Sequence, residues 1–299
     1  MPSTAAAQIS VIVRARDKVG TIGATLESLR RQTVPAEIIV VDSGSTDGTL
    51  ELANRWADQV IEIPPAEFTY GGALNTGAAA ASCDVHASLS AHCVLPTDTW
   101  VADSLRRYER FDVAATNQRE HTPTGQPILD TYWQTLADAA ARPGWGFSNH
   151  ASTWRADVWK EQPFREDLLA CEDKEWSWQV LASGRTIAYG PDLFVGTVHR
   201  RAAGFSALVE RVGREAEAMV SMGAADPLST AEFLQACWSS FPTTGPRPRW
   251  VRRASPLRLA ELLGSWLGGR RARPLPEVQL GELLAAHGLH RAPWPYLPW

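Results

Sequence analysis

The sequence predicts an α/β fold, a mostly parallel sheet with helices on both faces, followed by a helical C-terminal extension. Short apolar runs rich in Val and Ile alternate with stretches of helical periodicity over the first ninety residues. Alternating strands and helices need crossover connections, which produce parallel sheets covered on both faces. From residue 205 the pattern is helical. We therefore expect one domain over 1–204 and an extension over 205–299 that ends in a Pro-rich tail.

The first ninety residues contain the clearest elements. In the first expected helix, Ile22, Leu26 and Leu29 recur at helical spacing, and the third helix consists of small residues. Strands are expected at 8–15, 36–42, 58–64 and 84–90, and helices at 20–32, 45–57 and 71–83.

The middle of the chain is mixed, with a turn-rich stretch at 142–150. Pro and Gly at 241–249 predict a break before a last helix with a leucine and tryptophan stripe. Helices are expected at 97–110, 128–141 and 172–183, and strands near 111–116, 186–190 and 193–198.

Composition limits the function classes. The 299 residues are 44% hydrophobic and 21% charged, which is ordinary for a globular protein. The net charge of −4 argues against generic nucleic-acid binding, which needs a basic surface. The four cysteines form no CxxC pair, and there is neither a signal-peptide pattern nor an apolar run of about 18 residues. We expect a cytoplasmic location.

One edge of the predicted sheet is the expected ligand site. Parallel sheets bind ligands beyond the carboxyl ends of their strands, which selects 14–17, 42–45 and 90–92. In "IIVVDSGSTDGT", Asp42 can accept a hydrogen bond from a base or ribose, and the following helix start can face a polar ligand. Alternatively, Asp42 and Asp47 cap the turn and the helix.

Several ordered motifs together resemble family 2 glycosyltransferases of the GT-A fold, whose sheet is Rossmann-like. They are "SVIVRARDKVGTIGATLESLRRQ", "EIIVVDSGSTDGT", "FTYGGALNTGAAAA", "LACEDKEWSWQVLASGRTIAYGP" and "VHR", within about residues 8–200. The resemblance implies transfer of a sugar from a nucleotide-sugar donor to an acceptor, with inversion and a divalent cation. It implies a donor site that includes Asp42, Asn75 and Gly77. From the strand-end rim we add Arg14, Ala15, Arg16, Ser43, Ser90 and Ala91 to the expected donor site.

The resemblance also implies the catalytic groups. Asp173 matches the base, and Glu172 is expected to orient the site, although both could simply cap a helix N-terminus. On the acceptor side we expect Asn149, His150 and Trp176. The tryptophan could instead fill the core, and "SNHASTW" could be a turn before a strand.

Two departures from the family pattern stand out. Arg14 and Arg16 replace uncharged residues, and we interpret them as donor phosphate contacts or as ion pairs with Asp42 or Asp47. Ser90 and His92, in "SAHC", occupy the acidic positions of the family's DxD metal motif.

His92 and the late His199 are the expected metal ligands. Imidazole suits Mn²⁺ and zinc-like ions better than Mg²⁺, so we expect Mn²⁺ to be preferred. Alternatives are packed histidines, or metal-free catalysis in which arginine charge and His92 stabilise the diphosphate.

The acceptor is expected to be a polysaccharide, a lipid-linked glycan or a natural product. A catalytically silent GT-A module that binds a sugar nucleotide or a protein partner is the alternative function. The segment 246–273 contains eight Arg and one Glu. It could lie peripherally on the anionic inner face of a membrane, or its helix could pack on the catalytic domain with a solvated basic rim.

Overall fold

The computed structural model describes residues 6–197, 204–240 and 256–294. Contacts divide the chain into two compact units. The first contains Met1–Ala139, Trp145–Leu168 and Glu172–Arg200, and the second contains Ala140–Gly144, Leu169–Cys171 and Arg201–Trp299. Two short segments of the expected first domain thus belong to the second unit, which a single boundary at 204/205 does not capture.

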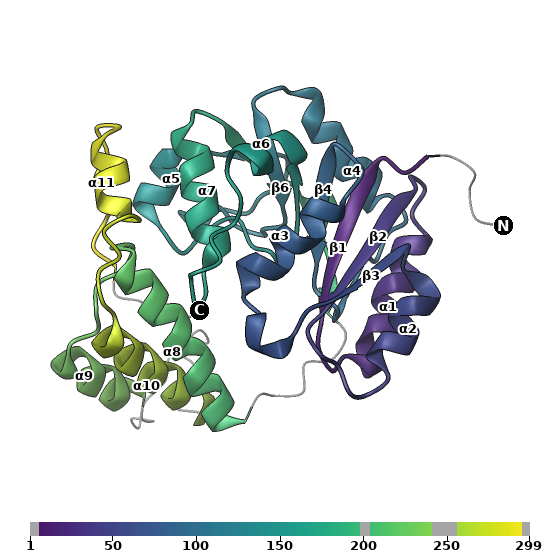
Figure 1. Cartoon of the computed structure of the whole chain (residues 1–299). Helices are drawn as coiled ribbons and strands as arrows, with labels where there is room; N and C mark the ends of the chain where they lie inside the picture. Colours follow the sequence, from purple (N-terminus) through teal and green to yellow (C-terminus); the bar gives the residue numbers. More distant parts are fainter. Residues whose placement is uncertain (1–5, 198–203, 241–255, 295–299) are drawn as a thin grey trace, which may run out of the picture. The chain divides into compact units, whose positions relative to one another are not determined.

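The first unit is built on an eight-stranded mixed sheet of strand order β3-β2-β1-β4-β8-β6-β9-β7 (Figure 1). Neighbours β3, β2, β1 and β4 run parallel, as do β6 and β9, whereas β8 runs antiparallel to β4 and β6. The strands are β1 Ile9–Ala15, β2 Ala36–Asp42, β3 Gln59–Glu62, β4 Val85–Leu89, β6 Val113–Asn117, β7 Tyr132–Gln134, β8 Ala151–Arg155 and β9 Thr186–Tyr189. A second small sheet pairs β5 Cys93–Val94 with β10 Gly196–Thr197.

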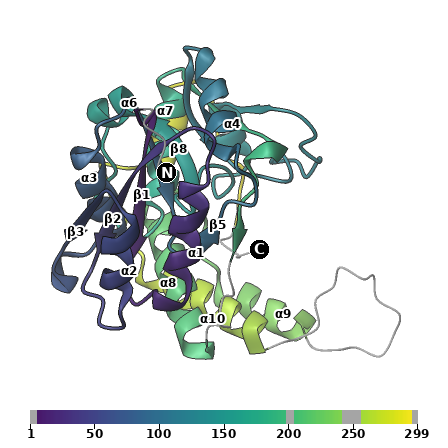
Figure 2. The same ribbon diagram turned by 90° about the vertical axis from the view of Figure 1, so that its right-hand side faces the viewer.

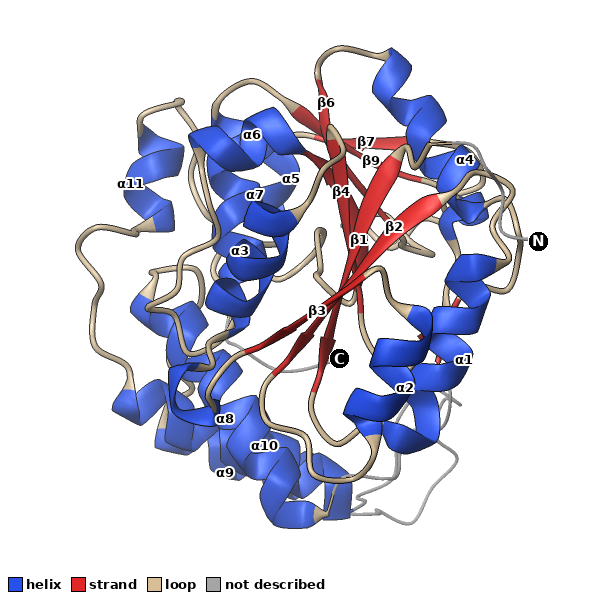
Figure 3. Ribbon diagram, turned by 45° about the vertical axis from the view of Figure 1, so that its right-hand side comes forward, coloured by secondary structure: helices blue, strands red, loops and turns tan. Residues whose placement is uncertain are grey.

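Helices cover both faces of this sheet, as expected. Figure 3 shows α1 (Val19–Arg30) and α2 (Thr49–Trp56) on one side and α3 (Tyr70–Ala80) with α7 (Glu172–Ala182) on the other. Because strand side chains alternate, the odd-numbered β1 residues join the core under α1, while Ile12 faces α3. There Gly77 lets α3 approach closely, since an added Cβ would lie 2.5 Å from Ile12 Cγ2.

The sheet register sets the position of the ligand edge. Ala15 pairs with Asp42 at the ends of β1 and β2, and Ile12 pairs with Ser88 near the end of β4. The loops after these three strands therefore leave the sheet at the same edge.

One expected helix is wrong. The segment 128–141 contains strand β7 and then the short helix α5 (Leu136–Ala141). Tyr132, Trp133 and Gln134 pair antiparallel with β9, and the Tyr189 hydroxyl donates to Gln134 Oε1 at 2.6 Å. Tertiary pairing of an aromatic segment thus overrides its local pattern. The unit also contains α4 Trp100–Arg106, α6 Ala156–Glu161 and the 3₁₀ turns Pro65–Glu67, Arg107–Glu109 and Pro191–Leu193.

The second unit is helical, with α8 (Phe205–Ser221), α9 (Thr230–Ser240), α10 (Pro256–Arg271) and α11 (Leu280–Ala285). Helices α8, α9 and α10 lie side by side (Figures 1 and 2). Helix α10 approaches α8 through Gly264, whose added Cβ would lie 2.7 Å from the Val209 carbonyl oxygen.

The apolar stripe of α10 takes part in this packing. Leu262 is fully buried, and the Trp266 ring stacks on Phe233 of α9 at 5.2 Å. The helix thus packs against helices of its own unit. Residues 241–255, which belong to the same basic segment, lie outside the described residues. No helix among the described residues is long and apolar enough to span a bilayer.

Candidate active site

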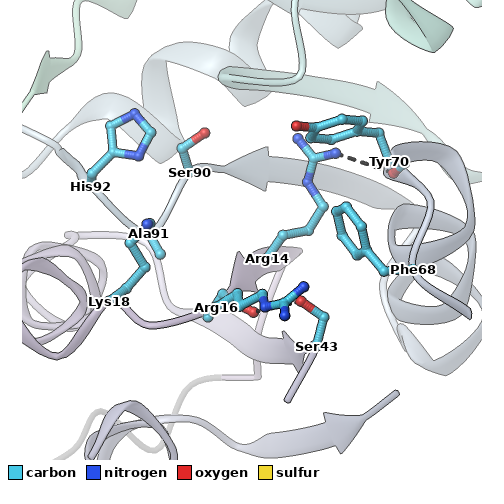
Figure 4. Close-up of a pocket in the computed structure, with 10 residues that line it drawn as sticks. Arg14, Arg16, Lys18, Ser43, Phe68, Tyr70, Ser90, Ala91 and His92 are labelled. Carbon is cyan, nitrogen blue, oxygen red and sulfur yellow. Dashed lines mark hydrogen bonds between the residues drawn. The ribbon is translucent and has the colours of Figure 1, made fainter. Parts of the chain in front are cut away.

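A pocket of about 450 Å³ lies at the carboxyl edge of β1, β2 and β4. This volume is in the range of small-molecule sites. Figure 4 shows the Arg14 guanidinium against Tyr70, Arg16 beside Ser43, and His92 near Ser90. The lining residues are Arg14, Ala15, Arg16, Lys18, Ser43, Phe68, Tyr70, Ser90, Ala91 and His92. All three strand ends expected to form the rim contribute to it.

The Asp42 carboxylate holds its own loop together. Its Oδ1 accepts from the backbone N–H of Gly44 (2.9 Å) and of Ser45 (2.8 Å), and its Oδ2 accepts from Ser45 Oγ at 2.5 Å. The side chain is fully buried and does not line the pocket. Asp42 therefore shapes the loop that presents Ser43, which supports the turn-capping interpretation.

Arg14 couples the end of β1 to the acidic start of α7. Its Nη1 lies 3.6 Å from Glu172 Oε1 and donates to the Tyr70 carbonyl oxygen at 3.1 Å. Its guanidinium also lies 5.4 Å from the Tyr70 ring centroid. The expected ion pair with Asp42 or Asp47 is thus replaced by one with Glu172.

Arg16 and Lys18 carry the other pocket cations. Neither side chain forms an ion pair with any described residue. Arg16 is exposed, and Lys18 is held through its backbone N–H, which donates to Thr49 Oγ1 at 2.7 Å. Their charges are therefore available to an anionic ligand.

Glu172 and Asp173 are positioned by Asn149. The Asn149 side-chain amide donates to Glu172 Oε1, and its backbone N–H donates to Asp173 Oδ2, each at 3.2 Å. Burial and then the Asp173 charge raise the pKa of Glu172, against the opposing effects of Arg14 and Asn149. Glu172 is 5% exposed, whereas Asp173 is half-buried. Asp173 is thus the more accessible acid of the pair.

Three side chains that could bind a metal ion through nitrogen or sulfur lie beside the pocket. The ligand atoms of His92, Cys93 and His150 all lie within 4.8 Å of one another. The Cys93 Sγ is 3.0 Å from His150 Nε2, and the two imidazole centroids are 5.1 Å apart. From the sequence we expect His150 on the acceptor side, and no sequence motif singles out Cys93. His199 lies outside the described residues.

Four residues differ from their expected positions. Trp176 is fully buried against Phe147 and Phe164, which supports the core interpretation over an acceptor contact. Asn149 is 2% exposed and serves the acid pair. Neither Asn75 nor Gly77 lines the pocket. Asn75 instead accepts from Trp159 Nε1 at 2.9 Å and donates to the Phe164 carbonyl oxygen at 2.7 Å, while Gly77 packs on the sheet.

The pocket does not fit a hard, oxygen-ligated cation. Its lining contains Arg14, Arg16 and Lys18 but no carboxylate. Mg²⁺ and Ca²⁺ prefer anionic oxygen ligands, and none of the lining side chains supplies one. The imidazole of His92 fits a borderline ion better.

Comparison with known proteins finds similarity to glycosyltransferases. Residues 10–146, somewhat under half of the chain, match the sequence profile "Glycosyl transferase family 2". Glycosyltransferase AglE of Haloferax volcanii is 25% identical over 199 residues, covering 62% of this chain and 65% of the relative. The O-antigen chain rhamnosyltransferase WbaN of Salmonella anatum is 40% identical over 47 residues, covering 16% and 15%. The chain thus spans less than two thirds of each of these relatives' lengths.

A solved structure confirms the fold. The mannosyltransferase PcManGT from Pyrobaculum calidifontis, in complex with GDP-Man and Mn²⁺, superposes with a TM-score of 0.56 at 18% identity. The match covers 95% of this chain and 76% of that one. The first unit has the GT-A fold, and residues 10–146 match the family 2 profile. Glu172 and Asp173 lie beyond the matched profile.

Proposed function

We propose that this chain is an inverting glycosyltransferase that moves a sugar from a nucleotide-sugar donor to an acceptor hydroxyl. The family 2 match and the glycosyltransferase relatives support the reaction class. One observation carries the site assignment: an acid pair held by Asn149 is linked through Arg14 to a cationic pocket at the carboxyl edge of the sheet.

The pocket suits a nucleoside diphosphate sugar. A diphosphate is a compact anion, and Arg16 and Lys18 offer it charge that no described acid neutralises. Phe68 and Tyr70, whose rings meet edge to face at 5.2 Å, supply an apolar wall for a base or sugar ring.

The acid pair divides two tasks. Asp173 takes the proton of the acceptor hydroxyl while that oxygen bonds to the anomeric carbon. The bond from this carbon to the diphosphate oxygen breaks on the opposite face, which inverts the configuration. Arginine and lysine charge stabilises the departing diphosphate. Glu172, whose pKa is raised by burial, positions Arg14 and Asn149.

The cation preference follows from His92. We expect Mn²⁺ to support more activity than Mg²⁺, since imidazole binds borderline ions better than hard ones. The manganese in the mannosyltransferase neighbour is consistent with such an ion. Equal activity with both metals, or full activity after exhaustive chelation, would contradict this expectation.

A donor screen followed by turnover tests the proposal. Nucleoside diphosphate sugars are screened by thermal shift, and nucleoside diphosphate release is then measured with polysaccharide, lipid-linked and small-molecule acceptors. Asp173→Asn should reduce turnover by about 10²–10⁴-fold with little change in donor binding. Asp130→Asn, at an exposed acid outside the site, is the control. Donor binding without turnover in the unaltered protein would favour the silent sugar-nucleotide-binding module.

A further inference from the structure

His92, Cys93 and His150 form a preorganised cluster of candidate metal ligands, the His–Cys–His cluster. His150 immediately precedes β8, and Ser90 immediately follows β4, its antiparallel neighbour. The Ser90 N–H donates to the His150 carbonyl oxygen at 2.9 Å, which extends this pairing by one step. Two segments far apart in sequence are thereby fixed side by side.

The turn after β4 brings Cys93 to the same place. The Cys93 N–H donates to the Ser90 carbonyl oxygen at 2.8 Å, which closes a tight turn over Ser90–Cys93. Strand β5 then pairs Cys93 with Thr197 of β10. Backbone hydrogen bonds therefore hold the segments that carry all three side chains, so little ordering remains to be done when a ligand binds.

The chemistry of the donors selects the ion. One thiolate and two imidazoles are typical ligands of Zn²⁺ and Co²⁺, whereas Mg²⁺ and Ca²⁺ prefer oxygen. Cys93 is fully buried, so a thiolate there needs a compensating positive charge. A bound divalent ion supplies that charge and displaces the thiol proton.

The cluster meets the pocket at one point. His92 lines the pocket, whereas Cys93 and His150 do not. Three protein ligands leave one position of a tetrahedral ion for an outside group, as in catalytic zinc sites.

We propose that His92, Cys93 and His150 bind one divalent ion of the zinc class, with its fourth position open toward the pocket. The ion site does not depend on sugar transfer, although it shares His92 with the cation site of the proposed function. In the proposed function, a diphosphate oxygen of the sugar donor takes the fourth position of the ion, and this part of the proposal rests on that function.

Cobalt is the spectroscopic probe of this site. The full chain, carrying no histidine tag, is stripped with a chelator and titrated with Co²⁺. We expect one equivalent to bind, with a thiolate-to-cobalt charge-transfer band that Zn²⁺ abolishes and excess Mg²⁺ does not. Mutation of residues that only hydrogen-bond to metal ligands lowers metal affinity about 10–100-fold. Loss of a ligand should cost more, so we expect Cys93→Ser to remove the band and weaken cobalt binding at least about 100-fold.

Matched variants separate the site from a folding defect. His150→Gln should weaken binding but retain the thiolate band at high cobalt concentration, and thermal unfolding checks the integrity of both variants. Cys83→Ser and His121→Ala lie outside the cluster and should leave binding unchanged. The proposal is overturned by less than one tenth of an equivalent of bound Zn²⁺, or by a band that survives in Cys93→Ser. Either result would leave only a thiol–imidazole contact.

Added nucleoside diphosphate tests the fourth position. We expect it to shift the cobalt ligand-field bands of the loaded protein. A cobalt site of one equivalent with unchanged bands would refute the diphosphate clause and leave the ion site standing. Loss of cobalt binding with intact donor turnover would refute the ion site and leave the proposed function standing.

Discussion

Replacing Arg14 should make stability depend more strongly on pH than replacing Glu172. Burial raises the pKa of Glu172, and Arg14 opposes that rise. In the folded protein Glu172 therefore holds its proton to a higher pH than in the unfolded chain. The free energy of unfolding falls as pH rises from the unfolded pKa to the folded one. Arg14→Met extends this loss upward in pH, whereas Glu172→Gln abolishes it.

The magnitude follows from the geometry. At 3.6 Å and an effective dielectric constant of about 20, the Arg14–Glu172 attraction is about 5 kcal/mol before desolvation. Removing one partner of a buried pair costs about 3–5 kcal/mol. At about pH 8 we expect Arg14→Met to lower the free energy of unfolding by about 3–5 kcal/mol. At about pH 5 we expect a loss of about 1–2 kcal/mol, because there the missing hydrogen bond to the Tyr70 carbonyl dominates.

Chemical denaturation at both pH values measures the effect. Arg16→Met, at an exposed cation without an ion pair among the described residues, should stay within about 0.5 kcal/mol of the unaltered protein. A cost for Arg14→Met that is equal at both pH values would show that the pair is not ionised.

Three further predictions concern donor binding, catalysis and packing. Removing Arg16 and Lys18 charge (Arg16→Ala, Lys18→Ala) should raise the donor KM about 10–100-fold each, measured by nucleoside diphosphate release; unchanged KM values would exclude phosphate contact. Asn149→Ala should lower kcat, because the acid pair loses a hydrogen bond, and should leave the donor KM unchanged, because Asn149 does not line the pocket. A change in KM without a change in kcat would contradict this. Gly268→Ala should destabilise the second unit by about 1–3 kcal/mol, because its Cβ would overlap a backbone carbonyl of α8. Gly281→Ala, which meets open space in α11, should be neutral or stabilising, and equal effects in thermal unfolding would refute the packing argument.

The strands could be predicted where local pattern and burial agree. The apolar run at 36–42 predicts β2 with its observed bounds. The β7 strand could not be predicted, because Gln134 and its neighbours are strands through pairing with β9. The same reasoning placed Arg14 and His92 at one edge, since parallel strand ends meet there.

The side-chain contacts at that edge could not be predicted from the sequence. Pairing of Arg14 with Glu172 depends on where α7 begins relative to β1, which no local pattern encodes. The cluster of Cys93 and His150 depends on β8 running antiparallel beside β4, across 57 positions of sequence. A cysteine after "SAH" and a histidine before "ASTW" were the available signals, and they acquire meaning only through that reversed strand.

The reversed strand also limits how the site can be redesigned. Asn149 and His150 are consecutive, yet Asn149 hydrogen-bonds to the acid pair whereas His150 belongs to the His–Cys–His cluster. Insertion or deletion of one residue beside β8 would exchange their directions and disable both. Engineering of acceptor specificity should therefore leave the length of this segment unchanged and vary loops that do not enter β8.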